Sequence, residues 1–181
     1  MSDQQYKIAK VVVIGQQNAG KSTLIHRIVH GEFAMELTET MGVDFSTKQF
    51  PGRKLNIWDT AGQEQFNSLN KAFYRKAQLA FVVFDLSNED GLQNVSFWMM
   101  QATEMIKNDF ELILIGSKSD LEQKIGESEL KTALQAFNRK FIRVSSKTGE
   151  GIDEILHIMK DFDVQDLDPP LVEKDEKQGC C

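Results

Sequence analysis

Residues 15–22 read GQQNAGKS, a glycine followed by any four residues and then Gly-Lys-Ser, and this stretch decides the fold. The preceding residues 7–14, KIAKVVVI, are rich in β-branched side chains and predict a buried strand, while residues 21–29 predict a helix. Glycines in such a loop let successive backbone N–H groups surround a polyphosphate at the helix N-terminus, where the helix dipole favours anions. The context therefore predicts a phosphate-binding loop over the alternative of a glycine-bounded turn with a solvated lysine.

Two side chains of this loop carry its expected chemistry. Lys21 is expected to reach the β- and γ-phosphates, and the Ser22 hydroxyl is a suitable oxygen ligand for Mg²⁺. A nucleotide with Mg²⁺ is thus the expected ligand. The predicted nucleotide contacts in this stretch are Gly15, Gln17, Asn18, Ala19, Gly20, Lys21, Ser22 and Thr23.

The rest of the chain predicts an α/β fold built on a mostly parallel sheet. Pro51-Gly52 separates two runs that predict a hairpin, and later short apolar runs are separated by stretches long enough for helices. We expect a P-loop NTPase fold, with six strands including one antiparallel edge strand and about five flanking helices. One domain is predicted over residues 1–162, with a flexible tail over 163–181. The predicted elements are strands 45–50, 55–58, 79–84, 111–115 and 141–144, a helix from a capping box at Ser87 toward Asn108, and a helix over 152–162.

Composition narrows the possible functions. The chain has 181 residues, which suits one domain, and its formal charge is −6. From Asp161 onward, seven acidic residues face two lysines, which gives −5 there and leaves −1 for the rest. No basic patch is expected, so nucleic acid is not an expected partner. No apolar run approaches the length of a membrane span and no signal peptide is recognised, so a cytosolic protein is expected.

Residues 117–120, SKSD, directly follow a predicted strand and so lie at the sheet edge where open α/β folds bind ligands. The carboxylate of Asp120 can accept two hydrogen bonds from the ring N–H and the exocyclic amine of guanine, whereas adenine offers no matching pair of donors. The predicted nucleotide is therefore GTP or GDP.

These motifs resemble those of the Ras superfamily: WDTAGQE at 58–64, SKSD at 117–120 and SSK at 145–147, within a similarity that covers residues 7–162. Within that superfamily the chain resembles a Rab small GTPase, through MGVDF at 41–45, FYRKA at 73–77 and the terminal Cys180-Cys181. The resemblance implies a Ras-like G domain and a switch that cycles between GDP and GTP, hydrolyses GTP slowly and recruits effectors in vesicle trafficking. Two alternatives stay open, a GTP-loaded interaction module with little or no hydrolysis and an ATP-using enzyme.

The resemblance implies roles around the base. Phe33 is expected to stack edge-on against guanine, Lys118 to pack on its face, and the Ser146 amide to meet its carbonyl oxygen. Ser145 and Lys147 would support that loop. Ser117 stands where relatives carry Asn and is expected to bridge fewer groups, which predicts faster nucleotide exchange.

The resemblance also implies the switch chemistry. Thr40 would ligate Mg²⁺, Asp59 would hold it through water, the Gly62 amide would contact the γ-phosphate, and Gln63 would orient the attacking water as the catalytic residue. Gln17 stands where relatives carry Gly, Ser or Ala, and its bulk predicts weakened hydrolysis.

The implied partners are an exchange factor, a GTPase-activating protein and effectors, with the chain itself a monomer. Phe45, Trp58 and Phe73 resemble the aromatic residues that Rabs present to effectors, although apolar strand residues are often core. Cys180 and Cys181 are expected to carry prenyl groups, with a vicinal disulfide as the weaker alternative. The predicted location is the cytoplasmic face of an intracellular membrane, in exchange with the cytosol.

Overall fold

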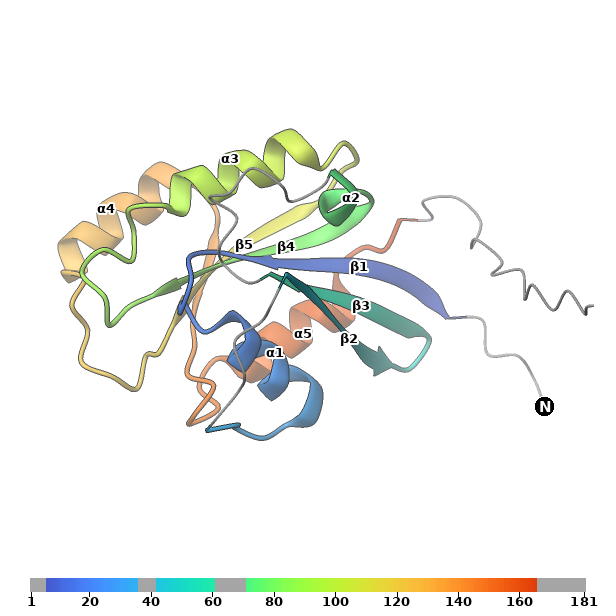
Figure 1. Cartoon of the computed structure of the whole chain (residues 1–181), viewed down its shortest axis with the longest axis horizontal. Helices are drawn as coiled ribbons and strands as arrows, with labels where there is room; N and C mark the ends of the chain where they lie inside the picture. Colours follow the sequence, from blue (N-terminus) through green and yellow to red (C-terminus); the bar gives the residue numbers. More distant parts are fainter. Residues whose placement is uncertain (1–5, 36–41, 61–70, 166–181) are drawn as a thin grey trace, which may run out of the picture.

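The computed structural model describes residues 6–35, 42–60 and 71–165 (Figure 1). Five residues with predicted roles lie outside the described residues: Thr40, Gly62, Gln63, Cys180 and Cys181.

The centre of the molecule is a six-stranded sheet in the order β2-β3-β1-β4-β5-β6. All neighbouring strands run parallel except β2 and β3, which confirms the predicted mostly parallel sheet with one antiparallel edge strand. Because parallel strands need crossovers, helices connect them and cover both faces. The strands are β1 (Lys7–Ile14), β2 (Val43–Phe50), β3 (Arg53–Thr60), β4 (Ala77–Asp85), β5 (Glu111–Ser117) and β6 (Lys140–Arg143).

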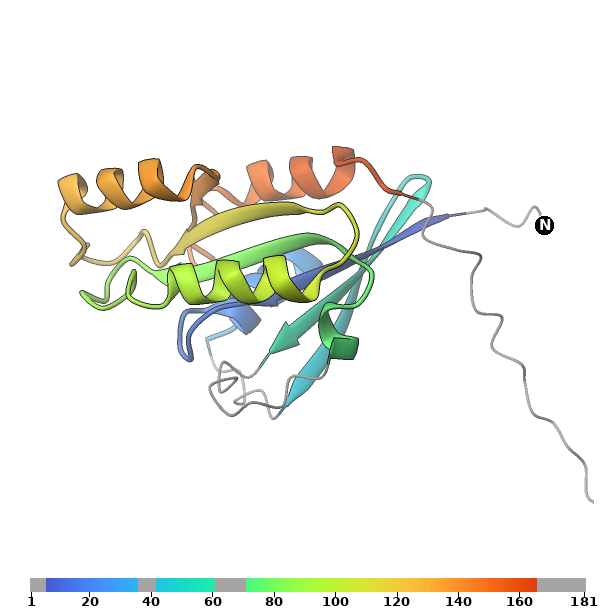
Figure 2. The ribbon, with the colours of Figure 1, turned by 90° about the horizontal axis from the view of Figure 1, so that it is seen from above.

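Five helices are present in the described ranges, as predicted, and they form two layers around the sheet. In Figures 1 and 2, α1 and α5 lie on one face of the sheet, and α2, α3 and α4 lie on the other. The helices are α1 (Lys21–His30), α2 (Lys71–Tyr74), α3 (Val95–Met105), α4 (Glu127–Phe137) and α5 (Ile152–Asp161).

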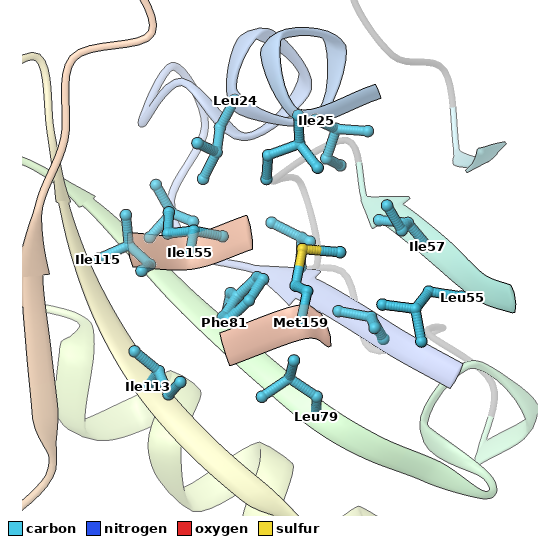
Figure 3. Close-up of a cluster of buried hydrophobic side chains, with 14 of the residues drawn as sticks. Leu24, Ile25, Leu55, Ile57, Leu79, Phe81, Ile113, Ile115, Ile155 and Met159 are labelled. Atoms are coloured by element: carbon cyan, nitrogen blue, oxygen red, sulfur yellow. The ribbon is translucent and has the colours of Figure 1, made fainter. Parts of the chain in front are cut away.

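A separate hydrophobic core fills each side of the sheet. Alternate residues of each strand point to opposite faces, so Val11 and Val13 of β1 join one core, while Val12 and Ile14 join the other. Figure 3 shows the first core, in which side chains of α1 and α5 meet those of the strands. Its labelled members are Leu24, Ile25, Leu55, Ile57, Leu79, Phe81, Ile113, Ile115, Ile155 and Met159.

The predicted helix start at Ser87 is wrong. The backbone N–H and the hydroxyl of Ser87 donate hydrogen bonds to Asp85 Oδ1, at 2.8 and 2.7 Å. The chain then passes through turns, and α3 begins only at Val95. The Ser87 side chain is engaged by the carboxylate that ends β4, so it does not cap a helix.

The packed part of the chain continues past the predicted boundary at residue 162. Val164 is buried, and Gln165 is held at both its backbone groups by the side chain of Gln78, with distances of 3.0 Å. Gln78 is the second residue of β4, so these hydrogen bonds hold Gln165 at the N-terminal end of that strand.

Candidate functional site

The predicted phosphate loop connects β1 to α1 and lies directly against the sheet. Gly15 has φ +141°, and a Cβ added there would lie 2.0 Å from the carbonyl oxygen of Val83 in β4. Gly20 has φ +88° and precedes the first residue of α1. Glycine tolerates these backbone conformations, so the loop can curve closely over the carboxyl edge of the sheet.

Lys21 places its ammonium group inside this curve. The side chain is only 4% exposed, and Nζ donates hydrogen bonds to the carbonyl oxygens of Gly15, at 2.8 Å, and Gln16, at 3.0 Å. A buried ammonium beside a helix N-terminus forms a site for an anion, because the charge and the helix dipole have the same sign. The loop geometry therefore suits a phosphate group.

The other predicted phosphate contacts lie along the same loop and first helical turn. Gln17 and Asn18 are exposed, and Asn18 has φ +61°. Ala19 is buried, whereas Ser22 and Thr23 are partly buried.

The predicted guanine-reading residues come from two loops that hydrogen bonds join. The hydroxyl of Ser145, which is fully buried, donates to Asp120 Oδ1 at 2.6 Å and accepts a hydrogen bond from the Thr148 backbone N–H at 3.1 Å. Asp120 itself is exposed, as a carboxylate that meets a ligand must be. Ser146 and Lys147 continue the loop after β6, partly buried and exposed, respectively.

Ser117 connects the loop that carries Asp120 to the phosphate loop. Its hydroxyl oxygen lies 2.6 Å from the carbonyl oxygen of Ala19 and 3.0 Å from that of Phe84. A hydroxyl has one proton to donate, so it cannot give a full hydrogen bond to both carbonyls at once, whereas the amide of Asn carries two such protons. That Ser117 bridges fewer groups than Asn stays a prediction.

Comparisons with known proteins agree with this geometry. The model of the Ras family matches residues 10–162. Ras-related protein Rab-4 of Dictyostelium discoideum is 34% identical over 82% of this chain and 75% of its own length. Ras-related protein SEC4 of Saccharomyces cerevisiae is 34% identical over 82% and 71%, and Ras-related protein Rab-4B of Homo sapiens is 32% identical over 88% and 80%. The chain belongs to the Rab family. Its fold is therefore that of a Ras-like G domain.

Ras-family GTPases in general bind guanine nucleotide with Mg²⁺, and the oxygen donors of this Rab-family chain fit that ion. Asp59, 5% exposed, lies near the carboxyl end of β3 beside Val13, two residues before the phosphate loop begins. Ser22 lies in the first turn of α1. The described ranges contain no cluster of three His, Cys, Asp or Glu side chains that could hold a metal. The carboxylate of Asp59 and the hydroxyl of Ser22 are oxygen donors, the ligand type that Mg²⁺ takes together with phosphate oxygens.

Phe33 lies two residues beyond Gly31, the residue that caps α1, and it is 37% exposed. A side-chain contact holds the residue before Phe33 close to α1, because His26 Nδ1 lies 3.2 Å from the Glu32 carbonyl oxygen. This exposure leaves the Phe33 ring available to a ligand.

The three aromatic residues predicted as an effector surface form a continuous row. The Phe45 and Trp58 rings lie edge to face at 5.6 Å, and those of Trp58 and Phe73 at 6.4 Å. Phe45 is 50% exposed and Trp58 is partly buried, but Phe73 is only 3% exposed and belongs to a core cluster. Phe73 therefore supports the row from beneath and contributes almost no surface.

Lys10, which the sequence did not single out, lies against this aromatic row. Its Nζ is 4.1 Å from the centre of the Trp58 ring and 5.9 Å from that of Phe73, and it donates a hydrogen bond to the Ala72 carbonyl oxygen at 3.0 Å. The ammonium thus connects β1 to α2 and to the aromatic row through cation–π contacts.

Burial lowers the pKa of Lys10 from its ordinary value of 10.5 to about 8. In that pH interval the unfolded chain binds more protons than the folded chain, so the contribution of Lys10 to the free energy of unfolding should rise with pH. Denaturant unfolding across this interval should show that the free energy of unfolding of the unsubstituted chain rises relative to that of Lys10→Met as the pH increases. Lys7→Met, an exposed lysine of the same strand, controls for loss of one charge. A difference that stays constant would contradict the expectation.

Three further residues near the site were not predicted from the sequence. The Ser119 hydroxyl donates to Glu150 Oε2 at 2.7 Å, which adds a second connection between the two guanine-side loops. Asp85 Oδ2 pairs with Lys118 Nζ at 2.7 Å. Ser119 occupies the variable position of its motif, and nothing in the sequence near Asp85 or Glu150 marks either residue.

Among the helices that the structure describes, none combines the length and hydrophobicity needed to cross a membrane.

Proposed function

We propose that this Rab-family chain is a molecular switch that binds GTP and GDP with Mg²⁺, hydrolyses GTP slowly and recruits effectors in intracellular membrane trafficking. One observation carries the proposal: the buried Lys21 lies in a phosphate loop that the Ser117 hydroxyl connects to the strand end preceding Asp120. This connection supports the proposal that the phosphate site and the base site lie at one edge of the sheet, where a single nucleotide can span them.

The residues of the loop bind and orient the phosphates. The loop amides and Lys21 hold negatively charged oxygens, and the fixed loop limits how far they can move. On the base side, Asp120 accepts hydrogen bonds from guanine, while Ser145 holds that carboxylate in position. The Ser146 amide would meet the guanine carbonyl oxygen, supported by Lys147.

The switch half of the site combines described and undescribed residues. Mg²⁺, when bound, neutralises charge on the phosphates. Ser22 and Thr40 would hold it directly, and Asp59 through water. Gly62 would contact the γ-phosphate through its amide, and Gln63 would orient the attacking water.

The aromatic row of Phe45 and Trp58 offers the surface for effectors. An aromatic pair that is partly exposed and braced by Phe73 and Lys10 presents a rigid apolar patch to a partner. An exchange factor and a GTPase-activating protein are further proposed partners. Prenyl groups on Cys180 and Cys181 would hold the chain at the cytoplasmic face of a membrane.

The experiment that tests the proposal is nucleotide competition on the purified full chain. Labelled GDP should bind at micromolar concentration or below, unlabelled GTP should displace it, and ATP at about 1,000-fold excess should not. Failure of a folded chain to bind GDP, or displacement by ATP, would overturn the proposal.

A second candidate is a GTP-loaded interaction module with little or no hydrolysis. The exposed side chain of Gln17 at the tip of the phosphate loop favours it, because a bulky group there crowds the space that Gln63 and an inserted arginine would use. Phosphate release from bound GTP separates the two candidates.

Replacing Gln17 should therefore change the rate of hydrolysis. Under single-turnover conditions, Gln17→Ser should release phosphate about tenfold faster, because a smaller side chain lets the attacking water reach its reactive geometry. Gln135→Ser, an exposed glutamine in α4, is the matched control and should leave the rate unchanged. The hypothesis fails if Gln17→Ser hydrolyses GTP no faster than the unsubstituted chain.

A further inference from the structure

Lys118, the lysine proposed to pack on the guanine base, has its charged end fixed by a residue outside the guanine-binding motifs. We propose that Asp85 is a positioning residue that holds Lys118 across the nucleotide site and thereby slows nucleotide release. The inference rests on the proposed function, since it concerns the same site.

Sheet register brings the two residues together. Asp85 is the last residue of β4 and lies opposite Ser117, the last residue of β5, so Lys118 begins one residue beyond this pair. Nζ of Lys118 lies 2.7 Å from Asp85 Oδ2, with side-chain exposures of 34% and 14%. An ion pair so largely shielded from water is less weakened by solvent than a surface pair.

Asp85 is itself held rigidly. Its other carboxylate oxygen, Oδ1, accepts hydrogen bonds from the backbone N–H and the hydroxyl of Ser87, at 2.8 and 2.7 Å. Burial alone raises the pKa of Asp85, but hydrogen bonds from Lys118 and Ser87 and the charge of Lys118 outweigh it and leave the pKa below its ordinary value. The group is thus a carboxylate with one oxygen committed to the Ser87 turn and the other to the lysine.

The backbone of Lys118 is fixed as well. Its φ is +58°, and its carbonyl oxygen accepts a hydrogen bond from the Leu121 N–H at 3.0 Å. The backbone N–H of the next residue, Ser119, donates a hydrogen bond to the Val144 carbonyl oxygen at 3.0 Å. With both ends held, the aliphatic part of Lys118 must span the space between them.

That span crosses the phosphate loop. The Lys118 Cε atom lies 3.9 Å from the position that a Cβ would take at Gly20. The lysine therefore extends from the guanine side over the last glycine of the loop toward β4. A side chain held extended in this way presents its methylene groups as a ready surface for a flat base, because its rotamer freedom is already lost before the nucleotide arrives.

The test is the rate at which a fluorescent GDP leaves the Mg²⁺-loaded full chain. Asp85→Asn should release GDP roughly tenfold faster than the unsubstituted chain, the size expected for restoring the mobility of one long side chain. The association rate of GDP with Asp85→Asn should change much less, because the substitution weakens a contact that is made only once GDP is bound. Asp109→Asn, an exposed aspartate at the opposite end of the sheet, is the control for charge and should release GDP at the unsubstituted rate.

A double-mutant cycle distinguishes positioning from a general structural effect. If Asp85 acts through Lys118, adding Asp85→Asn to Lys118→Met should accelerate release by no more than about twofold beyond Lys118→Met alone. Equal acceleration in both backgrounds would overturn the proposal, as would an unchanged rate in the single variant.

If Asp85→Asn fails to fold, Ser87→Ala keeps the proposal testable. It removes one bond to Asp85 without touching the ion pair, and a smaller acceleration of release is expected, again absent in the Lys118→Met background. No acceleration by Ser87→Ala would then count against the proposal. GDP binding by the unsubstituted chain serves as a separate readout: its absence defeats the proposed function, whereas normal binding with no effect of Asp85→Asn defeats only the role of Asp85.

Discussion

Lys21→Met should leave a folded chain that no longer retains guanine nucleotide, with a Kd for GDP weakened about 10²- to 10⁴-fold. A hydrogen bond to a charged group contributes about 1.5–3 kcal/mol, and Lys21→Met removes both such a bond to phosphate and the direct attraction between the buried ammonium and the phosphate charge. Methionine has a similar length and suits a site that is 4% exposed, so the substitution removes the charge more than the packing. Equilibrium titration with a fluorescent GDP measures the effect.

The control for Lys21→Met is Lys131→Met, an exposed lysine in α4 that should leave GDP affinity unchanged. Circular dichroism of both variants shows whether they are folded. An affinity of Lys21→Met close to that of the unsubstituted chain would mean that the phosphates bind elsewhere.

Gly15→Ala should destabilise the chain by about 3 kcal/mol or more and abolish nucleotide binding. The new methyl group would lie 2.0 Å from the Val83 carbonyl oxygen, which is backbone in the centre of the sheet and cannot move aside. To relieve the contact, the phosphate loop must lift off β4, and its N–H groups would then no longer converge on a phosphate.

A matched control separates the contact from the backbone conformation. Gly52, in the turn between β2 and β3, has φ +73° but nothing within 4 Å of an added Cβ. Gly52→Ala should cost only about 1 kcal/mol of conformational strain and leave GDP binding intact. Denaturant unfolding and GDP titration of both variants measure the difference, and equal losses in the two would show that the contact with Val83 is unimportant.

The elements that the sequence predicted well are those with a local signal. The apolar run of β1, the glycine spacing of the phosphate loop and the Pro51-Gly52 turn each depend on neighbouring residues, so their positions follow from periodicity and turn chemistry. The residues of the predicted guanine site likewise belong to short contiguous motifs. The pairing of Ser145 with Asp120 shows that these motifs meet, although the side-chain contact itself was not predicted.

What the sequence did not predict are polar contacts between different elements. Ser87 matched a helix cap by spacing, but the carboxylate at the end of β4 engages it instead. Asp85 meets Lys118 from 33 residues away, and Lys10 meets Ala72 from 62 residues away. Such contacts depend on strand register and on helix placement, which hydrophobic patterning does not specify.

The two hydrogen bonds between Gln165 and Gln78 fix the point at which the chain leaves the domain. Gln78 and Asp85 occupy opposite ends of β4, about 23 Å apart at the usual rise per residue. Any segment that continues beyond Gln165 therefore starts at the end of the domain that lies away from the phosphate loop. If prenyl groups on Cys180 and Cys181 anchor this segment in a bilayer, as proposed, the attachment begins at the end of the domain opposite the nucleotide site, which leaves that site within reach of soluble regulators.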